Sequence, residues 1–161
     1  MHLSPLRPVD RIRLEGILVA TAAFSQEEVG VALELFDESS ADYEFIGAFE
    51  DNALLGYACF GATPATDGTY DLYWLAVDPA AQGRGVGRTL VRWVERELEL
   101  RGARLLVIET SSRADYATTR EFYARSGYQE AARVRDFYAP ADDRIILTTR
   151  LTATERGVAT R

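Results

Sequence analysis

The segment from Tyr70 to Thr110 constrains the fold of this chain more than any other part. It reads as an apolar strand over 70–77, a glycine-rich turn, an amphipathic helix over 85–101 and a second apolar strand over 104–110. Two strands joined by such a helix run parallel, with a right-handed crossover. The second strand is a continuous apolar run, which is typical of a central strand covered on both faces. A parallel pair therefore lies inside the predicted sheet.

The remaining predicted strands are mostly antiparallel. Positions 11–19, RIRLEGILV, place Ile12 and Leu14 on one face of a strand. Ser25 and Glu28 form a capping box that begins a helix. The other predicted elements are a hairpin of strands 43–50 and 54–61 separated by Asp51 and Asn52, a short helix over 118–127, and a second hairpin of strands 128–138 and 144–151. The fold class is α+β, with a mixed, mostly antiparallel sheet.

The chain has the size and composition of one folded domain. Its 161 residues are 47% hydrophobic and 27% charged. We expect one domain over 1–161, with an ordered core over 10–151 and frayed ends over 1–9 and 152–161. No apolar run approaches the ~20 residues that span a bilayer, and the first ten residues lack the apolar core of a secretion signal. The sequence thus predicts a cytoplasmic protein with no membrane partner.

Charge and the scarcity of two residue types exclude several function classes. The net charge is −7, so the basic surface that nucleic acid requires is missing. An acidic surface instead weakly attracts a cationic substrate such as an amine. Cys59 is the only cysteine and His2 the only histidine. A disulfide framework, a zinc site of Cys and His, and a triad with a histidine base are therefore excluded, and we expect no metal.

The glycines between the first strand and the helix predict a phosphate site. Such a turn presents unpaired backbone N–H groups and the positive end of the helix dipole, and glycine lets a ligand approach that backbone. The P-loop pattern fails, because Gln82 stands where its first glycine is required and Arg88 replaces its lysine. The dinucleotide pattern also fails, starting at either Gly83 or Gly85. What remains is Gln82-x-x-Gly85-x-Gly87, after the sequence LAVDP.

This stretch resembles the signature of the GNAT acetyltransferases, Q/R-x-x-G-x-G/A, which holds the pyrophosphate of acetyl-coenzyme A. Downstream, REFYARSGYQE is similar to the family's second motif, a Phe-Tyr pair followed by Arg, Gly and an aromatic residue. The order of elements fits from the first strand to Leu151. The resemblance implies a GNAT-like three-layer domain with a C-terminal hairpin, acetyl-coenzyme A as co-substrate, and transfer of its acetyl group to an amine.

The resemblance also implies which residues bind the co-substrate. The family's strand before the signature carries a bulge and splays from the next strand, so that backbone N–H groups among Leu75, Ala76 and Val77 face the thioester carbonyl. The sequence does not determine which of these N–H groups points at the oxygen. Tyr116 stands where the family often has an asparagine that contacts the coenzyme arm, and its hydroxyl can donate a hydrogen bond or its ring can stack. The pyrophosphate site comprises Gln82, Gly83, Arg84, Gly85, Val86, Gly87 and Arg88. For the two arginines the alternative is an ordinary solvated helix residue.

Attack of an amine on a thioester needs an acid and a base. Tyr123 matches the family's general-acid tyrosine, and a phenol suits protonation of the leaving thiolate. The alternative is a core aromatic beside Phe122. Asp71 occupies the place of a glutamate base in related histone-modifying members and can act through a water; the alternative is a strand-edge charge or a cap. Glu109, on the facing strand, is the second candidate for the base.

The predicted function is transfer of an acetyl group from acetyl-coenzyme A to a primary amine of a small molecule or protein, by direct attack in a ternary complex. Cys59, the only thiol available for an acyl-enzyme, lies in a predicted core strand. One rival is a non-catalytic acyl-coenzyme A sensor, against which Tyr123 and Asp71 argue. A structural module, the other rival, has no use for the glycine turn. Phe137 and Tyr138, beside a hairpin turn, are candidates for the acceptor-pocket wall or a homodimer contact.

Overall fold

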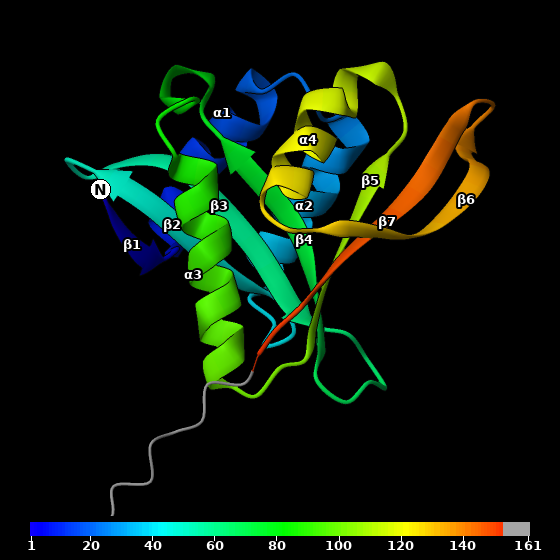
Figure 1. The fold of residues 1–161 in the computed structure, drawn as a ribbon. Helices are drawn as coiled ribbons and strands as arrows, with labels where there is room; N and C mark the ends of the chain where they lie inside the picture. Colours follow the sequence, from blue (N-terminus) through cyan, green and yellow to red (C-terminus); the bar gives the residue numbers. More distant parts are fainter. Residues whose placement is uncertain (153–161) are drawn as a thin grey trace, which may run out of the picture.

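A seven-stranded sheet organises the molecule (Figure 1). The computed structural model describes residues 1–152. Neighbouring strands are antiparallel except β4 and β5, which are parallel. The predicted mixed, mostly antiparallel sheet with one parallel crossover is confirmed. In the sheet order β1-β2-β3-β4-β5-β7-β6, the strands are β1 (His2–Pro5), β2 (Glu44–Glu50), β3 (Ala53–Ala62), β4 (Thr69–Val77), β5 (Leu105–Ser111), β6 (Gln129–Ala139) and β7 (Asp142–Arg150).

Helices cover both faces of this sheet. Figure 1 shows α3 and α4 in front of the sheet and α1 and α2 behind it. Two clusters of buried side chains fill the space between the layers, one with Leu90 and Leu98 of α3 and the other with Leu14 and Ile17 of α1. The three-layer arrangement that the resemblance implies is confirmed. The helices are α1 (Arg11–Ala20), α2 (Gln26–Glu38), α3 (Val86–Leu100) and α4 (Ala117–Arg125).

Local sequence signals determine several element ends. Ser25 Oγ accepts a hydrogen bond from Glu28 N at 3.1 Å, while Glu28 Oε2 accepts one from Ser25 N at 2.7 Å. Asp51 and Asn52 have positive φ angles of 48° and 65°, as a two-residue turn between twisted strands requires. Gly102 follows α3 with a φ of 79°. These are the capping box, the hairpin and the helix stop that the sequence predicts.

The predicted strand over 11–19 is wrong, because this segment forms α1. Leu14, Ile17 and Leu18 are buried at helical spacing, whereas Ile12 is 83% exposed. The alternation of Ile12 and Leu14 is too short to compete with three apolar residues three and four positions apart. The segment therefore packs as a helix against the rear face of the sheet.

The expectation of frayed residues over 1–9 is also wrong. β1 pairs with β2 from His2↔Phe49 to Pro5↔Ile46, and the next residue, Leu6, donates its N–H to Phe45 O at 3.1 Å. These backbone groups close the edge of β2, and no side-chain pattern reveals such pairing. The other expected frayed end, over 152–161, lies outside the described residues from residue 153 onward.

Candidate active site

β4 and β5 pair only at their beginnings. The parallel pairing runs from Thr69↔Leu105 to Leu72↔Ile108. Beyond it, among the residues that the structure describes, 74–77 of β4 pair with β3 alone and 109–111 of β5 pair with β7 alone. The two strands thus open into a fork, whose inner edges carry backbone N–H and C=O groups without a partner strand.

A β-bulge in β4 lies where the fork opens. Cys59 of β3 pairs with Trp74, whereas its neighbour Phe60 pairs with Leu72, so Tyr73 is the additional residue. A bulge bends its strand and increases the local twist, which separates the end of β4 from β5. The bulge and the splay that the resemblance implies are both confirmed.

The glycine turn follows the open end of β4. Asp78 begins it: its carboxylate accepts a hydrogen bond from Ala80 N at 2.8 Å and pairs with Arg13 of α1. These contacts, the hydrogen bond from Ala80 most strongly, hold the pKa of Asp78 below its usual range. Gly83 and Gly85 have φ angles of 75° and 82°, and Gly85 is the N-cap of α3. Because other residues rarely adopt this conformation, the backbone alone accounts for both glycines.

Gly87 has no such backbone explanation. It lies in the first turn of α3, and its φ is outside the left-handed region. A Cβ there would lie 3.5 Å from Phe122 and 3.6 Å from Val77, which is ordinary contact. Glycine in a helix costs about 1 kcal/mol relative to alanine. Bare backbone at this position is expected where a ligand approaches, and it fits a phosphate site at the turn.

The arginines around the turn have different surroundings. Arg84 pairs with Glu50 of β2 at 2.7 Å, and this contact raises the pKa of Arg84. Its guanidinium therefore already has a protein partner. Arg88 is exposed and, with Arg92 and Arg125, lines a cavity of about 220 Å³ between α3 and α4. Sequence reasoning missed Arg92 and Arg125, because only the packing of α4 beside α3 brings them close to Arg88.

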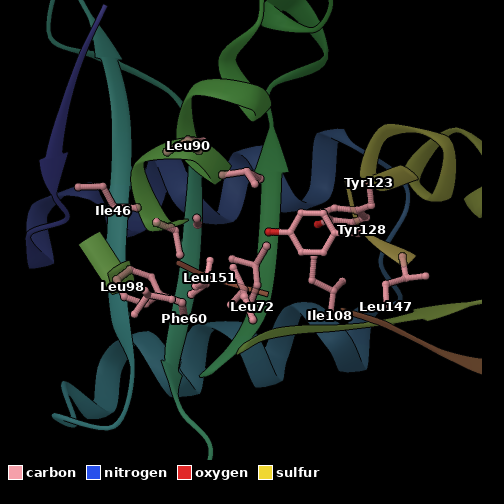
Figure 2. Packing of buried hydrophobic residues seen from close by; sticks show 14 of the residues in the cluster. Ile46, Phe60, Leu72, Leu90, Leu98, Ile108, Tyr123, Tyr128, Leu147 and Leu151 are labelled. Carbon is pink, nitrogen blue, oxygen red and sulfur yellow. The ribbon is translucent and has the colours of Figure 1, made fainter. Parts of the chain in front are cut away.

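Tyr123 is buried between α4 and the sheet. It is 5% exposed, and its ring centroid lies 5.2 Å from that of Phe122 and 5.6 Å from that of Tyr128. Figure 2 shows Tyr123 and Tyr128 together above Ile108 of β5. Burial raises the pKa of Tyr123, so its phenol is neutral at physiological pH and keeps a proton to donate.

The two candidate bases lie on different sides of the point at which β4 and β5 separate. Asp71 lies below it, in the part of β4 that pairs on both sides, and its Oδ2 accepts a hydrogen bond from Thr63 Oγ1. Glu109 is the first residue of β5 beyond the parallel pairing, and its side chain is 42% exposed. Side chains alternate along a strand, so Glu109 points to the face opposite that of Ile108, which packs in the cluster of Tyr123.

Two side chains of the β6–β7 hairpin hold Glu109. Tyr138 Oη donates a hydrogen bond to Glu109 Oε1, and Arg144 pairs with Glu109 Oε2 at 2.7 Å. The guanidinium of Arg144 lies 5.0 Å from the ring centroid of Phe137. Phe137 and Tyr138 thus lie beside a candidate base. Sequence reasoning missed Arg144, because only the register that pairs it with Ser111 brings it to this place.

A model of the family described as "Acetyltransferase (GNAT) family" matches residues 11–128. The chain belongs to the GNAT family. Members of this family use acetyl-coenzyme A. The resemblance inferred from the two motifs is confirmed.

Two curated GNAT relatives are N-acetyltransferases by name. The chain is 35% identical over 103 residues to N-alpha-acetyltransferase RimI of Mycobacterium tuberculosis, covering 62% of this chain and 61% of that protein. It is 36% identical over 87 residues to the ribosomal protein bS18-alanine N-acetyltransferase of Escherichia coli K12, covering 54% and 57%. The chain thus matches only about three fifths of the length of these relatives.

Solved structures show the same fold over nearly the whole chain. A crystal structure from Desulfovibrio desulfuricans, described as being of the GNAT family, is 42% identical and has a TM-score of 0.89, covering 92% of this chain and 98% of that one. An aminoglycoside 6'-N-acetyltransferase complexed with coenzyme A is 17% identical with a TM-score of 0.74, covering 93% and 97%. The second likeness shows the fold alone.

In this GNAT chain, Tyr116 contacts the connection between α1 and α2. Its hydroxyl donates a hydrogen bond to Ala23 O at 2.8 Å, and the guanidinium of Arg113 lies 5.2 Å from its ring centroid. Desolvation raises the pKa of Tyr116, so the hydroxyl stays protonated. This hydroxyl thus already has a protein partner. The expected contact of Tyr116 with the coenzyme arm stays a prediction.

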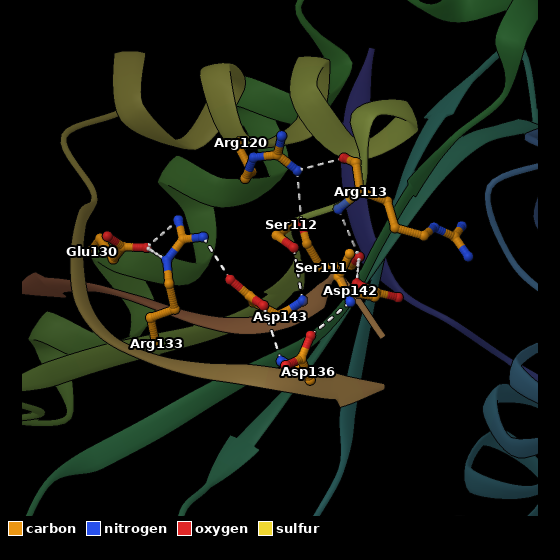
Figure 3. A network of polar contacts seen from close by, with 10 residues as sticks. Ser111, Ser112, Arg113, Arg120, Glu130, Arg133, Asp136, Asp142 and Asp143 are labelled. Atoms are coloured by element: carbon orange, nitrogen blue, oxygen red, sulfur yellow. Dashed lines mark hydrogen bonds and ion pairs between the residues drawn. The ribbon is translucent and has the colours of Figure 1, made fainter. Parts of the chain in front are cut away.

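A polar network fixes the segment that follows β5 (Figure 3). Arg120 of α4 donates hydrogen bonds to the carbonyls of Ser111 and Arg113, at 2.7 and 2.8 Å. Ser111 Oγ bonds to the buried carboxylate of Asp142 and accepts a hydrogen bond from Arg113 N at 3.1 Å. The segment that leads to Tyr116 is thereby tied to α4 and to the β6–β7 hairpin.

Three observations concern metal binding, membrane spans and an acyl-enzyme on Cys59. Within residues 1–152, no group of three or more His, Cys, Asp or Glu is arranged to hold a metal ion. No helix in the described part of the chain is long and apolar enough to cross a bilayer. Cys59 is buried, and burial raises the pKa of its thiol to about 12, which disfavours the thiolate that an acyl-enzyme would need.

Proposed function

We propose that this protein transfers an acetyl group from acetyl-coenzyme A to a primary amine, by direct attack of the amine on the thioester. The observation that carries the proposal is the fork between β4 and β5, which leaves backbone donors and acceptors free on an inner sheet edge. An extended molecule with amide groups can pair with such an edge as a strand would. The glycine turn lies directly beyond that edge, where the phosphates of the same molecule are then bound.

Backbone groups bind and activate the co-substrate in this proposal. N–H groups from 82 to 87 bind the pyrophosphate, with the dipole of α3 behind them. Arg88 adds positive charge. Asp78 N donates a hydrogen bond to Leu55 O of β3. Successive N–H groups of a strand point to opposite edges, so the N–H of Ala76 faces β3 while those of Leu75 and Val77 face the fork. The N–H groups of Leu75 and Val77 stabilise the negative charge that develops on the thioester oxygen. This arrangement explains why a residue without a large side chain is kept at position 87.

Proton transfers to a base and from an acid complete the reaction. Glu109, through a water, takes a proton from the ammonium, and the freed amine nitrogen attacks the thioester carbon. The carbon–sulfur bond then breaks, and Tyr123 donates its proton to the departing thiolate. The attacking nitrogen loses its second proton, which returns to the Tyr123 phenolate through water and leaves a neutral amide. Because Glu109 and Tyr123 serve opposite faces of the sheet, the amine and the coenzyme enter the fork from opposite sides.

We favour Glu109 over Asp71 as the base because of its position. The side chain of Glu109 lies at the opening of the fork and is half exposed. Asp71 lies where β4 is paired on both sides and is engaged by the Thr63 hydroxyl. The hydroxyl of Tyr138 and the guanidinium of Arg144 orient the two carboxylate oxygens of Glu109, which leaves the remaining lone pairs for a water.

The acceptor is a primary amine of a small molecule or a protein. One relative is named for an alanine of ribosomal protein bS18, so peptides with a free N-terminal alanine belong in the acceptor panel beside small amines. The net charge of −7 favours a cationic acceptor of either kind.

Thiol release tests the proposal. The purified chain is incubated with acetyl-coenzyme A and each amine of the panel, and free coenzyme A and acetylated product are measured. We expect thiol release that depends on the amine, together with a saturable coenzyme A binding isotherm. Binding without release for any amine would support the sensor instead, and absence of binding would contradict the proposal.

A further inference from the structure

We propose that Tyr116 limits the size of the acceptor by holding residues 21–25, the α1–α2 connection, over the open end of the fork. The inference rests on the proposed function, because the fork is where the acceptor enters. Its basis is the hydrogen bond from Tyr116 Oη to Ala23 O at 2.8 Å, between residues 93 positions apart. No other side-chain contact described above links the segment after β5 to the rear helices.

This hydrogen bond joins the two arms of the fork. The connection that contains Ala23 belongs to α1 and α2, whose buried side chains cluster with Tyr57 of β3 and Ala76 of β4. Tyr116 belongs to the segment that follows β5. In Figure 1, the α1–α2 connection and the segment before α4 both lie at the end of the sheet where β4 and β5 terminate. The bond therefore closes the end at which the two strands have separated.

The two partners of this bond are held with unequal strength. The segment leading to Tyr116 is tied by Arg120 and Asp142 to α4 and to the hairpin. The connection is held by the end of α1, through Thr21 N to Ile17 O at 3.1 Å and Ala22 N to Val19 O at 3.2 Å, and by the packing of Phe24 against the cluster of Leu14 and Ile17. Tyr116 is thus the fixed partner, and the connection is the part that opens.

The conformation of the connection also favours opening. Ala22 has a φ of 52°, which costs a non-glycine residue free energy. Ala22 and Ala23 are both exposed, whereas Phe24 packs against the cluster of Leu14 and Ile17. Burial therefore holds the α2 end of the connection but contributes little at Ala22 and Ala23. Arg113 lies over the Tyr116 ring and pairs with Asp115 at 2.8 Å. Removal of the hydroxyl alone therefore leaves the ring in place and deletes only the bond to the connection.

A large acceptor must wait for the connection to open, whereas a small amine enters past it. The rate for the large acceptor is then reduced by the fraction of molecules that are open. Loss of one neutral hydrogen bond shifts such an equilibrium by about two- to tenfold. Tyr116→Phe should raise the ratio of kcat/KM for a short peptide with a free N-terminus to kcat/KM for ethylamine by this factor, because a change in coenzyme binding would affect both acceptors alike.

Hydrogen exchange supplies a measurement that needs no turnover. In the full chain without ligand, the hydrogen-bonded amides of Thr21, Ala22 and Ser25 should exchange faster in Tyr116→Phe, by the same factor that appears in the ratio of kcat/KM for the peptide to kcat/KM for ethylamine. Tyr116→Asn, which restores the family's usual residue, should release the connection equally. Tyr70→Phe is the matched control, because Tyr70 packs against the α3 cluster and lies away from the connection; it should change neither measurement.

Each other outcome counts against the inference. Unchanged exchange over 21–25 in Tyr116→Phe would mean that Tyr116 does not hold the connection. Faster exchange with an unchanged preference between peptide and ethylamine would remove the link to acceptor size. A raised KM for acetyl-coenzyme A with unchanged exchange would assign Tyr116 to the coenzyme arm instead. If no amine were acetylated at all, the proposed function would fail, and acceptor selection with it, while exchange would still decide whether Tyr116 holds the connection.

Discussion

The two halves of β4 differ in how many of their edges are paired, and they serve different purposes. From Tyr70 to Leu72 the strand is paired on both sides, and its backbone hydrogen bonds are satisfied within the sheet. From 74 to 77 it pairs with β3 alone, and the other edge faces the fork. The lower half stabilises the fold, whereas the upper half keeps polar backbone groups available to a ligand. The bulge at Tyr73 is the change in geometry that separates the two halves.

The comparison extends to the acidic residues beside β4. Asp71 belongs to the closed half and Glu109 to the opening of the fork. If chemistry occurs only in the open half, substitutions there should affect turnover or ligand affinity, and substitutions in the closed half should not. The predictions below test this division, from the largest expected effect to the smallest.

Tyr123→Phe should have the largest effect. The ring keeps its packing against Phe122 and Tyr128, and only the proton donor is lost. We expect kcat to fall by about 10²–10⁴-fold with little change in coenzyme affinity. Tyr128→Phe is the matched control: it removes the hydroxyl that donates to Glu95 at 2.8 Å but should leave turnover near the wild-type value. Steady-state kinetics of both variants decide the matter, and equal losses in the two would assign the effect to packing.

Glu109→Gln and Asp71→Asn form the next test. If Glu109 is the base, Glu109→Gln should lower kcat by about 10²-fold near neutral pH. Its rate should recover as pH rises, because solution then supplies free amine. Asp71→Asn should stay within about threefold of wild type, and Tyr123→Phe should show no recovery at high pH. A pH–rate profile of each variant is the measurement. The reverse pattern, with the loss at Asp71, would restore Asp71 as the base and break the division between the two halves.

Gly87→Val should weaken coenzyme A binding by at least about tenfold, the effect of 1.4 kcal/mol. The reason is that a branched side chain occupies the place where a phosphate approaches the helix. Gly87→Ala is the control, because a Cβ fits at this position and the family signature accepts alanine. Titration calorimetry measures the affinities, and thermal unfolding verifies that both variants are folded. Wild-type affinity in Gly87→Val would show that the turn does not bind the phosphates.

Removal of metal ions should have no effect. Aminolysis of a thioester needs only the acid, the base and the backbone donors of the fork, and the described residues contain no cluster suited to a metal. Turnover after exhaustive treatment with EDTA should equal that of the untreated protein. An activity that falls on chelation and returns with one divalent ion would place a metal in the mechanism.

Much of the fold was predictable because it follows from local signals. The capping box at Ser25, the turn at Asp51 and Asn52, and the helix after Gly85 each depend on a few neighbouring residues. The errors came where several interactions compete. The segment 11–19 carries a short alternation and a longer helical spacing, and the packing of α1 on the sheet decides between them. β1 is held by backbone pairing, which leaves no periodic side-chain pattern.

The parts of the candidate site that belong to a sequence motif were predictable. The parts that depend on how the strands pair were not. The glycine turn and Tyr123 are recognisable from the sequence because each lies in a compact pattern. The contact of Arg144 with Glu109 depends on the pairing of β5 with β7, and that of Tyr116 with Ala23 joins distant segments. Neither leaves a signal in the spacing of residues. The choice between Asp71 and Glu109 likewise needed the exact residue at which β4 and β5 part.

Hydrogen exchange along β4 tests the central claim most directly, because it compares the two halves of one strand with and without coenzyme A. The amides from 70 to 72 should be protected in both states, since they belong to the paired half. The account predicts that coenzyme A slows exchange over 75–77 and over the first turn of α3, with no change over 70–72. Saturating coenzyme A that left 75–77 unchanged, or protected only residues away from the fork, would contradict it.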